Sequence, residues 1–241
     1  MNEKLKKVLK NVKLVIFDLD GTLIDSNGTG NELDIEISKM LGETKGNDEI
    51  IRERDNFFSK IEYKGDIYLE YCDYLKKKYN SHLTKEEILN IRREKSKELA
   101  KKIQFKPYAD VVIKDLKDKK IKLALATVSR RATLSIYTNE NVNMKSKCNL
   151  NEYFDYIITK DDVKNKKPDP EVYNKIINYF NIERDKAIVI EDSLTGIKAA
   201  KAANITTIAI YDKFSDNDRE KINELSDYQV QNFKQLMELF N

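Results

Sequence analysis

Residues 14–22 read LVIFDLDGT, in which a run of four apolar residues, Leu14–Phe17, ends at two aspartates, Asp18 and Asp20. So short a run of consecutive apolar residues is typical of a strand buried on both faces, as in a parallel sheet. Ligands of open parallel sheets bind beyond the carboxyl ends of the strands. The sequence therefore predicts a buried strand that carries two acidic side chains to the edge where a ligand would bind.

Further apolar runs of the same kind follow later in the chain, and helical patterns lie between them. The runs are Ile121–Thr127, Tyr156–Thr159, Ala187–Ile190 and Thr206–Ile210, and the helical patterns include Val111–Lys119, Pro170–Phe180 and Leu194–Ala203. Alternating strands and helices favour right-handed crossover units. We therefore expect an α/β fold whose core is a doubly wound, Rossmann-like parallel sheet.

The stretch from about residue 30 to residue 103 has a different pattern. Apolar positions 67, 71, 74 and 75 recur at the spacing of one helix face. Thr84, with Glu87 three residues later, makes a capping box that opens a helix to about Lys102. This pattern predicts a separate all-α domain, residues 28–104, inserted after the first strand of a core formed by residues 1–27 and 105–241. The glycine-containing stretch 27–30 and the stretch 105–107 are candidate hinges, although the former equally fits a plain loop.

The composition excludes several classes of protein. The chain has 241 residues, of which 40% are apolar and 35% charged, and its formal net charge is +3. This balance is too apolar for a disordered chain and too weakly basic to indicate a nucleic-acid surface. The single histidine, His82, excludes a histidine-rich zinc site, and the two cysteines, Cys72 and Cys148, match no metal-ligand spacing.

The sequence contains no stretch that reads as a targeting signal or a membrane span. The first apolar run, Leu14–Phe17, is too short for a signal peptide, and no run approaches the ~20 apolar residues of a spanning helix. We therefore expect a cytoplasmic protein with no membrane partner, whose cysteines remain thiols.

Four predicted strand ends carry reactive side chains. Asp18 and Asp20 follow the first run, Thr127 ends the second, Lys167 lies in the loop after the third, and Glu191, Asp192 and Ser193 follow the fourth. Each alone has a structural explanation, because an acid after a strand often caps a helix and a lysine before a proline is often solvated. A calcium loop is excluded, since its glycine would be sixth from the first aspartate and Gly21 is fourth.

Together and in this order, the motifs resemble those of the haloacid dehalogenase superfamily of phosphohydrolases. The matching stretches are DLDGTLIDS (18–26), LATVS (125–129), KKPDPEVY (166–173) and IEDSLTGIKAAKAA (190–203). The resemblance covers the whole chain. It places the all-α insertion where this family carries a helical cap, as in phosphoglycolate phosphatases and β-phosphoglucomutases.

An aspartate at position 18 can attack phosphorus and form an acyl phosphate, but its charge opposes the approach of a phosphate ester. At ~4 Å and an effective dielectric of about 20, the repulsion is about 4 kcal/mol per charge pair. Asp18, Asp192 and Glu191 form a cluster of hard oxygen ligands suited to Mg²⁺. Lys167 supplies a fixed positive charge, and Thr127 supplies a hydroxyl donor for the phosphate oxygens.

The resemblance assigns two roles to Asp20. Its carboxyl group is the general acid for the leaving alkoxide and then the general base for the water that cleaves the aspartyl phosphate, and its backbone carbonyl joins the metal site. The two-residue spacing places the side chains of Asp18 and Asp20 on one side of an extended segment. A carboxylate at this position indicates a phosphatase or phosphomutase, because the dehalogenases of the family lack it.

Helical caps of this kind imply a small phosphate ester as substrate: a sugar phosphate, phosphoglycolate or a nucleotide. The candidate substrate contacts are Asn27, Thr29, Arg52, Arg54, Tyr63 and Lys64. Each of them also fits a solvated surface position. Ser129 and Arg130, next to Thr127, either border the phosphate or cap the following helix.

Three alternative functions are less well supported. β-Phosphoglucomutases carry a histidine soon after the first motif, whereas residues 27–31 contain none, which favours hydrolysis. A non-catalytic binding protein on the same fold would be expected to lack Asp18 or Lys167. Nucleic-acid binding depends on the lysine-rich stretch 114–122 alone, whose lysines interleave with Asp115 and Asp118 as on a solvated helix face.

Overall fold

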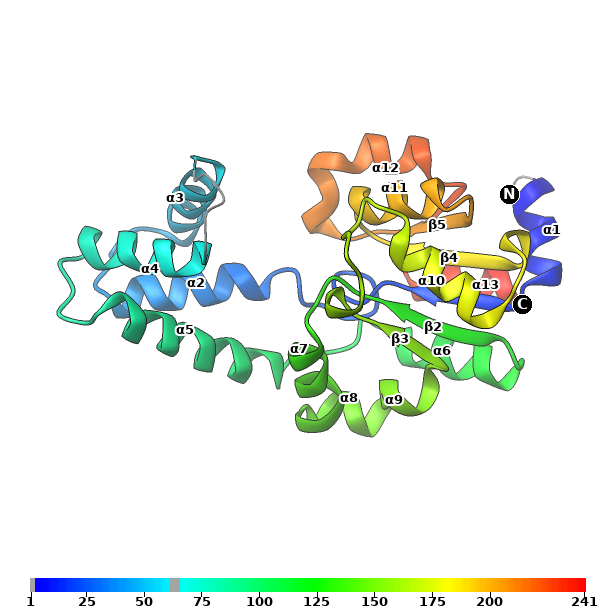
Figure 1. Ribbon diagram of the computed structural model, residues 1–241, viewed down its shortest axis with the longest axis horizontal. Coiled ribbons are helices and arrows are strands. Elements are labelled where there is room, and N and C mark those ends of the chain that lie inside the picture. The colour runs from blue at the N-terminus through cyan, green and yellow to red at the C-terminus, as the bar shows by residue number, and fades with distance from the viewer. Residues whose placement is uncertain (1–2, 61–65) are drawn as a thin grey trace. The chain divides into compact units, whose positions relative to one another are not determined.

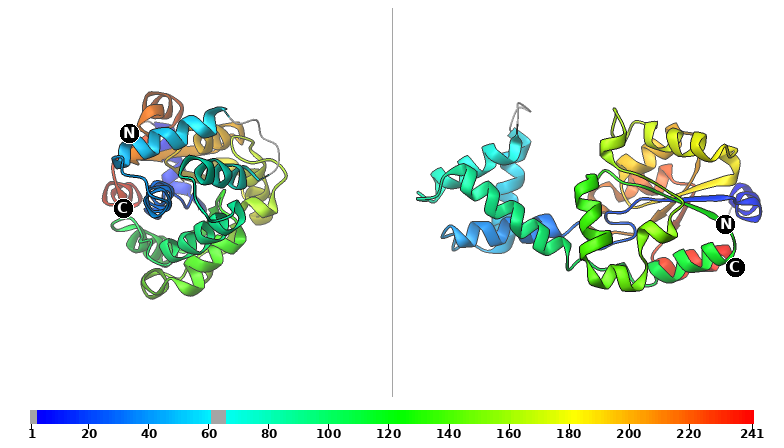
Figure 2. Two further views of the ribbon diagram at one scale, coloured as in Figure 1. Left: turned by 90° about the vertical axis from the view of Figure 1, so that its left-hand side faces the viewer. Right: turned by 60° about the horizontal axis from the view of Figure 1, so that its bottom comes forward.

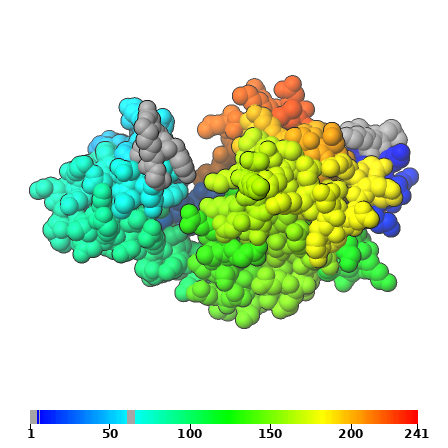
Figure 3. All heavy atoms as spheres, in the orientation of Figure 1, coloured from blue at the N-terminus to red at the C-terminus, as the bar shows by residue number. Residues whose placement is uncertain are grey.

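The computed structural model describes residues 3–60 and 66–241. The chain divides into two compact units, one made of the residues up to Asn27 together with Ile103–Asn241, and the other of Gly28–Lys102. The sequence places the second boundary after residue 104, two residues later than the structure does. Within each unit, side chains fill the spaces that the ribbons leave between neighbouring elements (Figure 3).

The larger unit is built on a six-stranded parallel sheet with the order β3-β2-β1-β4-β5-β6. Its strands are β1 (Leu14–Phe17), β2 (Lys122–Ala126), β3 (Tyr156–Ile158), β4 (Ala187–Glu191), β5 (Thr206–Ile210) and β6 (Tyr228–Val230). Leu14 pairs with Lys122 on one side of β1 and with Ala187 on the other. The strand order reverses at β1, which is where ligands bind in such sheets. The predicted doubly wound parallel sheet is confirmed.

The burial of the strands explains which of them the sequence reveals. Every residue of β1, β4 and β5 is buried, so each strand reads as an almost unbroken run of β-branched and apolar residues. β6 was not predicted from the sequence. It has three residues and is half exposed, with the polar Gln229 at its centre, so it leaves no apolar run to recognise.

Helices cover both faces of the sheet (Figures 1 and 2). They are α6 (Ala109–Asp118), α10 (Glu171–Phe180), α11 (Leu194–Ala202), α12 (Arg219–Leu225) and α13 (Phe233–Phe240). The helix α1 (Glu3–Asn11) lies instead beyond the amino ends of the strands, where it packs against the turn before β4 (Figure 1). α10 and α11 pack together over one face, and α6 packs with α13 over the other. Between α10 and β2, Tyr173 and Ile176 meet Ala124 and Ala126 in a buried cluster, which fixes the start of α10 near the carboxyl edge of the sheet.

Short helices fill the connection between β2 and β3. They are α7 (Arg131–Ser135), the π-helical turn η1 (Ile136–Glu140), α8 (Val142–Lys147) and α9 (Leu150–Tyr153). Asn141 caps α8 by accepting from the backbone N–H of Met144, and Asn149 caps α9 in the same way. The polar character of this segment therefore has a structural cause. Three 3₁₀ turns complete the unit: η2 (Lys160–Asp162), η3 (Arg184–Lys186) and η4 (Lys213–Asp218).

The smaller unit is all-α, as predicted. Its helices are α2 (Thr29–Met40), α3 (Asn47–Lys60), α4 (Ile67–Lys78) and α5 (Lys85–Ala100). Leu33, Ile37, Tyr71, Leu75 and Ile88 form its buried core. The capping box is confirmed, because Thr84 and Glu87 each accept the backbone N–H of the other, but α5 ends at Ala100, two residues before Lys102.

Both cysteines are buried thiols, with Cys72 in α4 and Cys148 directly after α8.

Among the described residues, no helix combines the length and the apolar character that crossing a bilayer requires.

Candidate active site

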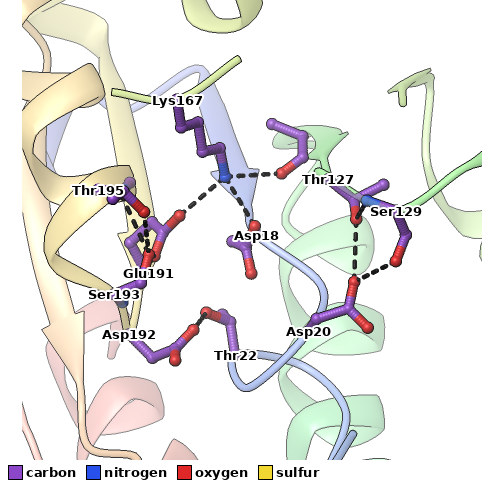
Figure 4. A network of polar contacts seen from close by, with 12 residues as sticks. Asp18, Asp20, Thr22, Thr127, Ser129, Lys167, Glu191, Asp192, Ser193 and Thr195 are labelled. Carbon is purple, nitrogen blue, oxygen red and sulfur yellow. Dashed lines mark hydrogen bonds and ion pairs between the residues drawn. The ribbon is translucent and has the colours of Figure 1, made fainter. Parts of the chain in front are cut away.

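The four motifs meet at the carboxyl edge of the sheet (Figure 4). Asp18 directly follows β1, Thr127 follows β2, Glu191 is the last residue of β4 and Asp192 is the next. Because β1 lies between β2 and β4, Asp18 stands between the ends of its two neighbours. Lys167, from the loop before α10, extends its ammonium group into the same cluster. The parallel register thus joins residues that are up to 174 positions apart in the sequence, from Asp18 to Asp192.

Lys167 is the cation at the centre of this cluster. Its Nζ donates to Asp18 Oδ1 at 2.7 Å, to Glu191 Oε1 at 2.8 Å and to the backbone carbonyl of Ala126 at 2.9 Å. These bonds use all the protons of the ammonium group. Nζ also lies 5.3 Å from the centre of the Tyr173 ring, and only 3% of the lysine side chain is exposed. The alternative of a solvated lysine is therefore excluded.

Asp18, Glu191 and Asp192 form a buried carboxylate cluster in which one ligand oxygen of each lies within 4.8 Å of the others. Donors hold Asp192 on both of its oxygens: Thr22 Oγ1 lies 2.7 Å from Oδ1, and Asn27 Nδ2 lies 3.3 Å from Oδ2. The cluster brings three carboxyl groups together with one ammonium group. Full ionisation would leave an excess of negative charge in a buried site.

Burial and neighbouring charges together set the ionisation of the cluster. Burial raises the pKa of Asp18 well above its usual value, and Glu191 and Asp192 add to this effect while Lys167 opposes it. Burial and the charge of Glu191 raise the pKa of Asp192 to about 7. Burial acts to lower the pKa of Lys167, but the charges of Asp18 and Glu191 outweigh it and hold this pKa well above its usual value. The site therefore contains a permanent cation beside carboxyl groups that ionise more easily when a further positive charge is supplied.

Two glycines let the backbone approach these carboxylates closely. A Cβ at Gly196 in α11 would lie 1.6 Å from Glu191 Oε1, so α11 packs closely on the site. A Cβ at Gly21 would lie 2.0 Å from Asn27 Nδ2 and 2.5 Å from Asp192 Oδ2, and the φ of +84° at Gly21 also favours glycine. Ser193 caps α11 by accepting from the backbone N–H of Gly196, which leaves Asp192 free of a capping role.

The expectation that the side chains of Asp18 and Asp20 lie on one side of an extended segment is wrong. The chain turns directly after Asp18, where Leu19 O accepts from the backbone N–H groups of Leu23 and Ile24, so the segment is not extended. The carboxylates of Asp18 and Asp20 line one cavity, but they point in different directions (Figure 4). The predicted metal ligand at Asp20 is its backbone carbonyl, and this role stays a prediction.

Hydroxyl groups hold the Asp20 carboxylate in place. Ser26 Oγ donates to Oδ1 at 2.8 Å, and Ser129 Oγ and Thr127 Oγ1 donate to Oδ2 at 2.7 and 3.1 Å. Thr127 Oγ1 also accepts from the backbone N–H of Ser129 at 2.9 Å. Thr127 directs its only hydroxyl proton to Asp20, so its predicted donation to a phosphate would require that bond to be exchanged, and this role stays a prediction. The Ser129 hydroxyl fixes the orientation of Asp20, and Arg130, which stands at the N-cap of α7, makes no side-chain cap hydrogen bond. Contact of either residue with the phosphate stays a prediction.

A cavity of about 370 Å³ lies over the cluster, within the larger unit. Asp18, Lys167 and Asp192 line it together with two partly exposed apolar side chains, Val128 at 45% and Phe214 at 40% exposure. Phe214 belongs to the turn η4 after β5, and no motif in the sequence marks it as part of the site. Thr22, which lies within the first motif, was likewise not singled out from the sequence.

The remaining candidates lie in both units. Asn27 belongs to the larger unit and lines the cavity, whereas Thr29, Arg52 and Arg54 belong to the smaller unit. The guanidinium group of Arg54 donates to Asn31 and to the buried Asp34 within that unit. Tyr63 and Lys64 fall outside the described residues. The lysine-rich stretch 114–122 forms ion pairs with acidic residues, such as Lys117 with Asp155 at 2.9 Å and Lys119 with Asp115 at 2.8 Å.

Comparison with known proteins decides the family. A family model described as haloacid dehalogenase-like hydrolase matches residues 15–210, which include all four motifs. The chain belongs to this family. The chain is 29% identical, over 82% of its length and 84% of the relative, to a phosphorylated carbohydrates phosphatase of Thermotoga maritima. It is 26% identical, over 85% and 82%, to a phosphoglycolate phosphatase of Photorhabdus laumondii.

Solved structures of haloacid dehalogenase-like hydrolases have the same fold. A crystal structure from Thermotoga maritima, provisionally described as a beta-phosphoglucomutase, superposes with a TM-score of 0.73. The match is 25% identical in sequence and covers 95% of this chain and 97% of the other. Members with related folds thus carry names of both phosphatases and phosphomutases, so the fold alone does not separate the two reactions.

As a haloacid dehalogenase-like hydrolase, the chain has a donor set that fits a divalent cation. Asp18, Glu191 and Asp192 offer hard carboxylate oxygens, the type of ligand that Mg²⁺ prefers, within 4.8 Å of one another. Gly21 and Gly196 leave room beside two of these carboxylates that a Cβ would fill. The raised pKa values of Asp18 and Asp192 point the same way, because a cation beside them would favour their charged forms.

Proposed function

We propose that this hydrolase cleaves small phosphomonoesters in a Mg²⁺-dependent reaction that passes through an aspartyl phosphate at Asp18. The observation that supports the proposal best is the position of Asp18: its Oδ1 accepts from Lys167 at 2.7 Å, and two further buried carboxylates lie beside it under the cavity. This arrangement combines a nucleophile with the positive charge that an anionic substrate needs.

The chain's own groups divide the chemistry between them. The Asp18 carboxylate attacks phosphorus, and the ester oxygen leaves with a proton from Asp20. Asp20 then takes a proton from a water molecule, whose oxygen attacks the aspartyl phosphate, so that inorganic phosphate leaves and Asp18 is regenerated. Lys167 keeps its charge throughout, because its pKa is held well above its usual value. Bound Mg²⁺ would supply additional positive charge at the phosphoryl oxygens.

The position of Asp20 supports its proposed acid–base role. Its carboxylate lines the same cavity as that of Asp18 but points in another direction (Figure 4), and donors from Ser26, Thr127 and Ser129 hold it there. An acid and a nucleophile that act on opposite sides of one phosphorus atom have to approach it from different directions. The serine and threonine hydroxyls fix the carboxylate without adding charge.

We favour hydrolysis over phosphoryl transfer within a sugar. The chain's single histidine, His82, precedes α5 in the smaller unit, and the start of α2 contains none. The names of two curated relatives, a phosphorylated carbohydrates phosphatase and a phosphoglycolate phosphatase, also favour a small phosphorylated metabolite as substrate. The cavity over Asp18, about 370 Å³, has room for a ligand of that size.

The test is phosphate release from a panel of sugar phosphates, phosphoglycolate and nucleotides, with added Mg²⁺ and with EDTA. We expect release from at least one ester with Mg²⁺ and loss of release in EDTA that Mg²⁺ restores. Full activity in EDTA would refute the metal requirement. Conversion of a sugar 1-phosphate to its 6-phosphate without net phosphate release would instead support the phosphomutase.

A further inference from the structure

Asp212 lies outside the four motifs but is connected to the carboxylate cluster. It follows β5, which ends at Ile210, and only 4% of the residue is exposed. Its Oδ2 accepts from Lys106 Nζ at 2.6 Å, and its Oδ1 accepts from Asn27 Nδ2 at 3.3 Å and from the backbone N–H of Phe214 at 2.9 Å. Each oxygen of this buried carboxylate therefore has a donor.

Asn27 joins Asp212 to Asp192. The same Nδ2 that donates to Asp212 also donates to Asp192 Oδ2 at 3.3 Å, so its two protons serve two carboxylates. An amide oxygen placed between these carboxylates would be repelled, and the orientation of the Asn27 side chain is thereby fixed. Gly21 leaves the space for the amide, since a Cβ there would lie 2.0 Å from Nδ2.

The ion pair with Lys106 keeps the Asp212 carboxyl group ionised, so that it can accept from Asn27. Burial acts to raise the pKa of Asp212, but the hydrogen bond and charge of Lys106 outweigh burial and lower the pKa. Asp212 is then an ionised carboxylate that can only accept, so Asn27 must donate. The pair is also close to neutral overall, so the ionised Asp212 adds little net charge to a site already rich in acids.

Asp212 also anchors the turn that borders the cavity. Its carboxylate accepts the backbone N–H of Phe214, its backbone carbonyl accepts from Ser215 N–H and from Arg219, and Ser215 Oγ in turn donates to Asp192 Oδ2 at 3.4 Å. Two routes therefore lead from Asp212 to the same oxygen of Asp192, one through Asn27 and the other through Ser215.

We propose that Asp212 is a positioning residue that orients Asp192 for a divalent cation, acting mainly through the Asn27 amide and itself held by Lys106. The inference rests on the proposed Mg²⁺-dependent function. Asn27 and Lys106 lie close to the two points where the chain leaves and re-enters the larger unit, so one carboxylate fastens both segments at the site. Partners one step removed from a metal ligand orient it and set its affinity.

The test is isothermal titration of Mg²⁺ into the full-length protein without substrate. Asp212→Ala removes the acceptor, and we expect its Mg²⁺ dissociation constant to rise by about tenfold or more, the usual scale for such partners. Asn27→Leu, which loses both amide protons, should show a similar rise. Asp212→Asn keeps an acceptor oxygen and should fall between Asp212→Ala and the wild type.

Asp155→Ala is the matched control, because Asp155 likewise accepts from a lysine, Lys117, and from a backbone N–H, that of Leu123, at the opposite edge of the sheet. It should lower the melting temperature and leave Mg²⁺ affinity unchanged.

A Mg²⁺ affinity within about twofold of the wild-type value in both Asp212→Ala and Asn27→Leu would overturn the inference. If Asp212→Ala does not fold, Asn27→Leu alone decides. If the wild type binds no Mg²⁺, the proposed function fails together with the inference. If the wild type is active and binds Mg²⁺ as tightly as both variants do, only the role of Asp212 is refuted.

Discussion

Asp18 combines two properties that conflict at the level of a single residue. A nucleophile must be ionised, yet burial and two neighbouring carboxyl groups raise its pKa well above the usual value. Lys167 opposes this effect through a direct 2.7 Å hydrogen bond. The site therefore depends on positive charge to make its aspartate reactive, and this dependence links the catalytic role of Asp18 to both Lys167 and the proposed metal.

Asp18→Asn should abolish hydrolysis while leaving the fold intact. The amide keeps the shape of the side chain but cannot attack phosphorus, so we expect kcat to fall by at least ~10³-fold. Steady-state phosphate release with the best substrate of the panel measures the loss. Asp25→Asn is the control, because Asp25 lies in the same motif but is exposed, and it should keep most of the activity. An Asp18→Asn rate above about a tenth of the wild-type rate would remove Asp18 from its assigned role.

The site residues that the sequence predicted lie next to a recognisable local pattern, whereas those that it missed do not. Asp18, Lys167 and Asp192 follow buried apolar strands or a recognisable loop motif, so local pattern marks them. Asp212 and Phe214 come from a polar turn whose sequence has no such pattern. Their role depends on contacts such as that of Asn27 with Asp212, which are 185 residues apart and form only when the sheet is assembled.

At the scale of elements, the packing of α11 on β4 determines the position of Glu191. The helix begins at Leu194, only three residues after the strand ends at Glu191. Its third residue, Gly196, lies against the Glu191 carboxylate. Glycine early in a helix costs about 1 kcal/mol relative to alanine, so its presence here has to be offset by the closer approach that it permits.

Gly196→Ala should therefore destabilise the protein although alanine is the better helix former. The new Cβ would lie 1.6 Å from Glu191 Oε1, and relieving this overlap should cost about 1–3 kcal/mol in the free energy of unfolding. Gly30→Ala in α2 is the matched control, because its Cβ would meet no described atom within 4 Å and should stabilise by up to about 1 kcal/mol. Urea unfolding of both variants measures the difference. Equal or higher stability of Gly196→Ala would contradict the close packing described here.

Sequence pattern was sufficient for most elements because their patterns are strong. The strands β1 and β5 occupy the predicted ranges, and the capping box at Thr84 begins α5 where expected. Pattern failed for β6, whose three residues alternate too briefly to be recognised. It also failed for the orientation of Asp20, because the i, i+2 rule applies to extended backbone and the chain turns after Asp18.

For the molecule as a whole, the buried carboxylates make stability depend on pH in an unusual direction. Burial and the charge of Glu191 raise the pKa of native Asp192 to about 7, against the ordinary 3.8 of an aspartate. Between these values the native state holds more protons than the unfolded state, so this group's contribution to stability is present at low pH and is lost as the pH rises towards about 7. A bound divalent cation would reverse this loss, because it favours the charged form.

The increase in melting temperature caused by saturating Mg²⁺ should therefore grow as the pH rises from about 5 to about 8. Circular dichroism melts in EDTA and in Mg²⁺ across this range give the difference directly, and the comparison cancels the titration of groups remote from the site. Asp192→Asn, which cannot titrate at this position, should show a smaller and flatter increase. A Mg²⁺ effect that does not change with pH would contradict the raised pKa of the cluster.

The chain passes from the larger unit to the smaller between Asn27 and Gly28 and returns between Lys102 and Ile103. Gly28 precedes α2, with φ −76° and ψ −16°, so proline fits its φ but would stiffen the first connection. We expect Gly28→Pro to change kcat and KM together, by about threefold or more, as hinge substitutions do. Gly46→Pro is the matched control, because Gly46 likewise precedes a helix, α3, but lies within the smaller unit. Steady-state kinetics of both variants on one ester measure the effect. A change in Gly28→Pro but not in Gly46→Pro indicates that flexibility at this connection is needed for turnover. Unchanged kinetics in Gly28→Pro would show that residue 28 is not a hinge.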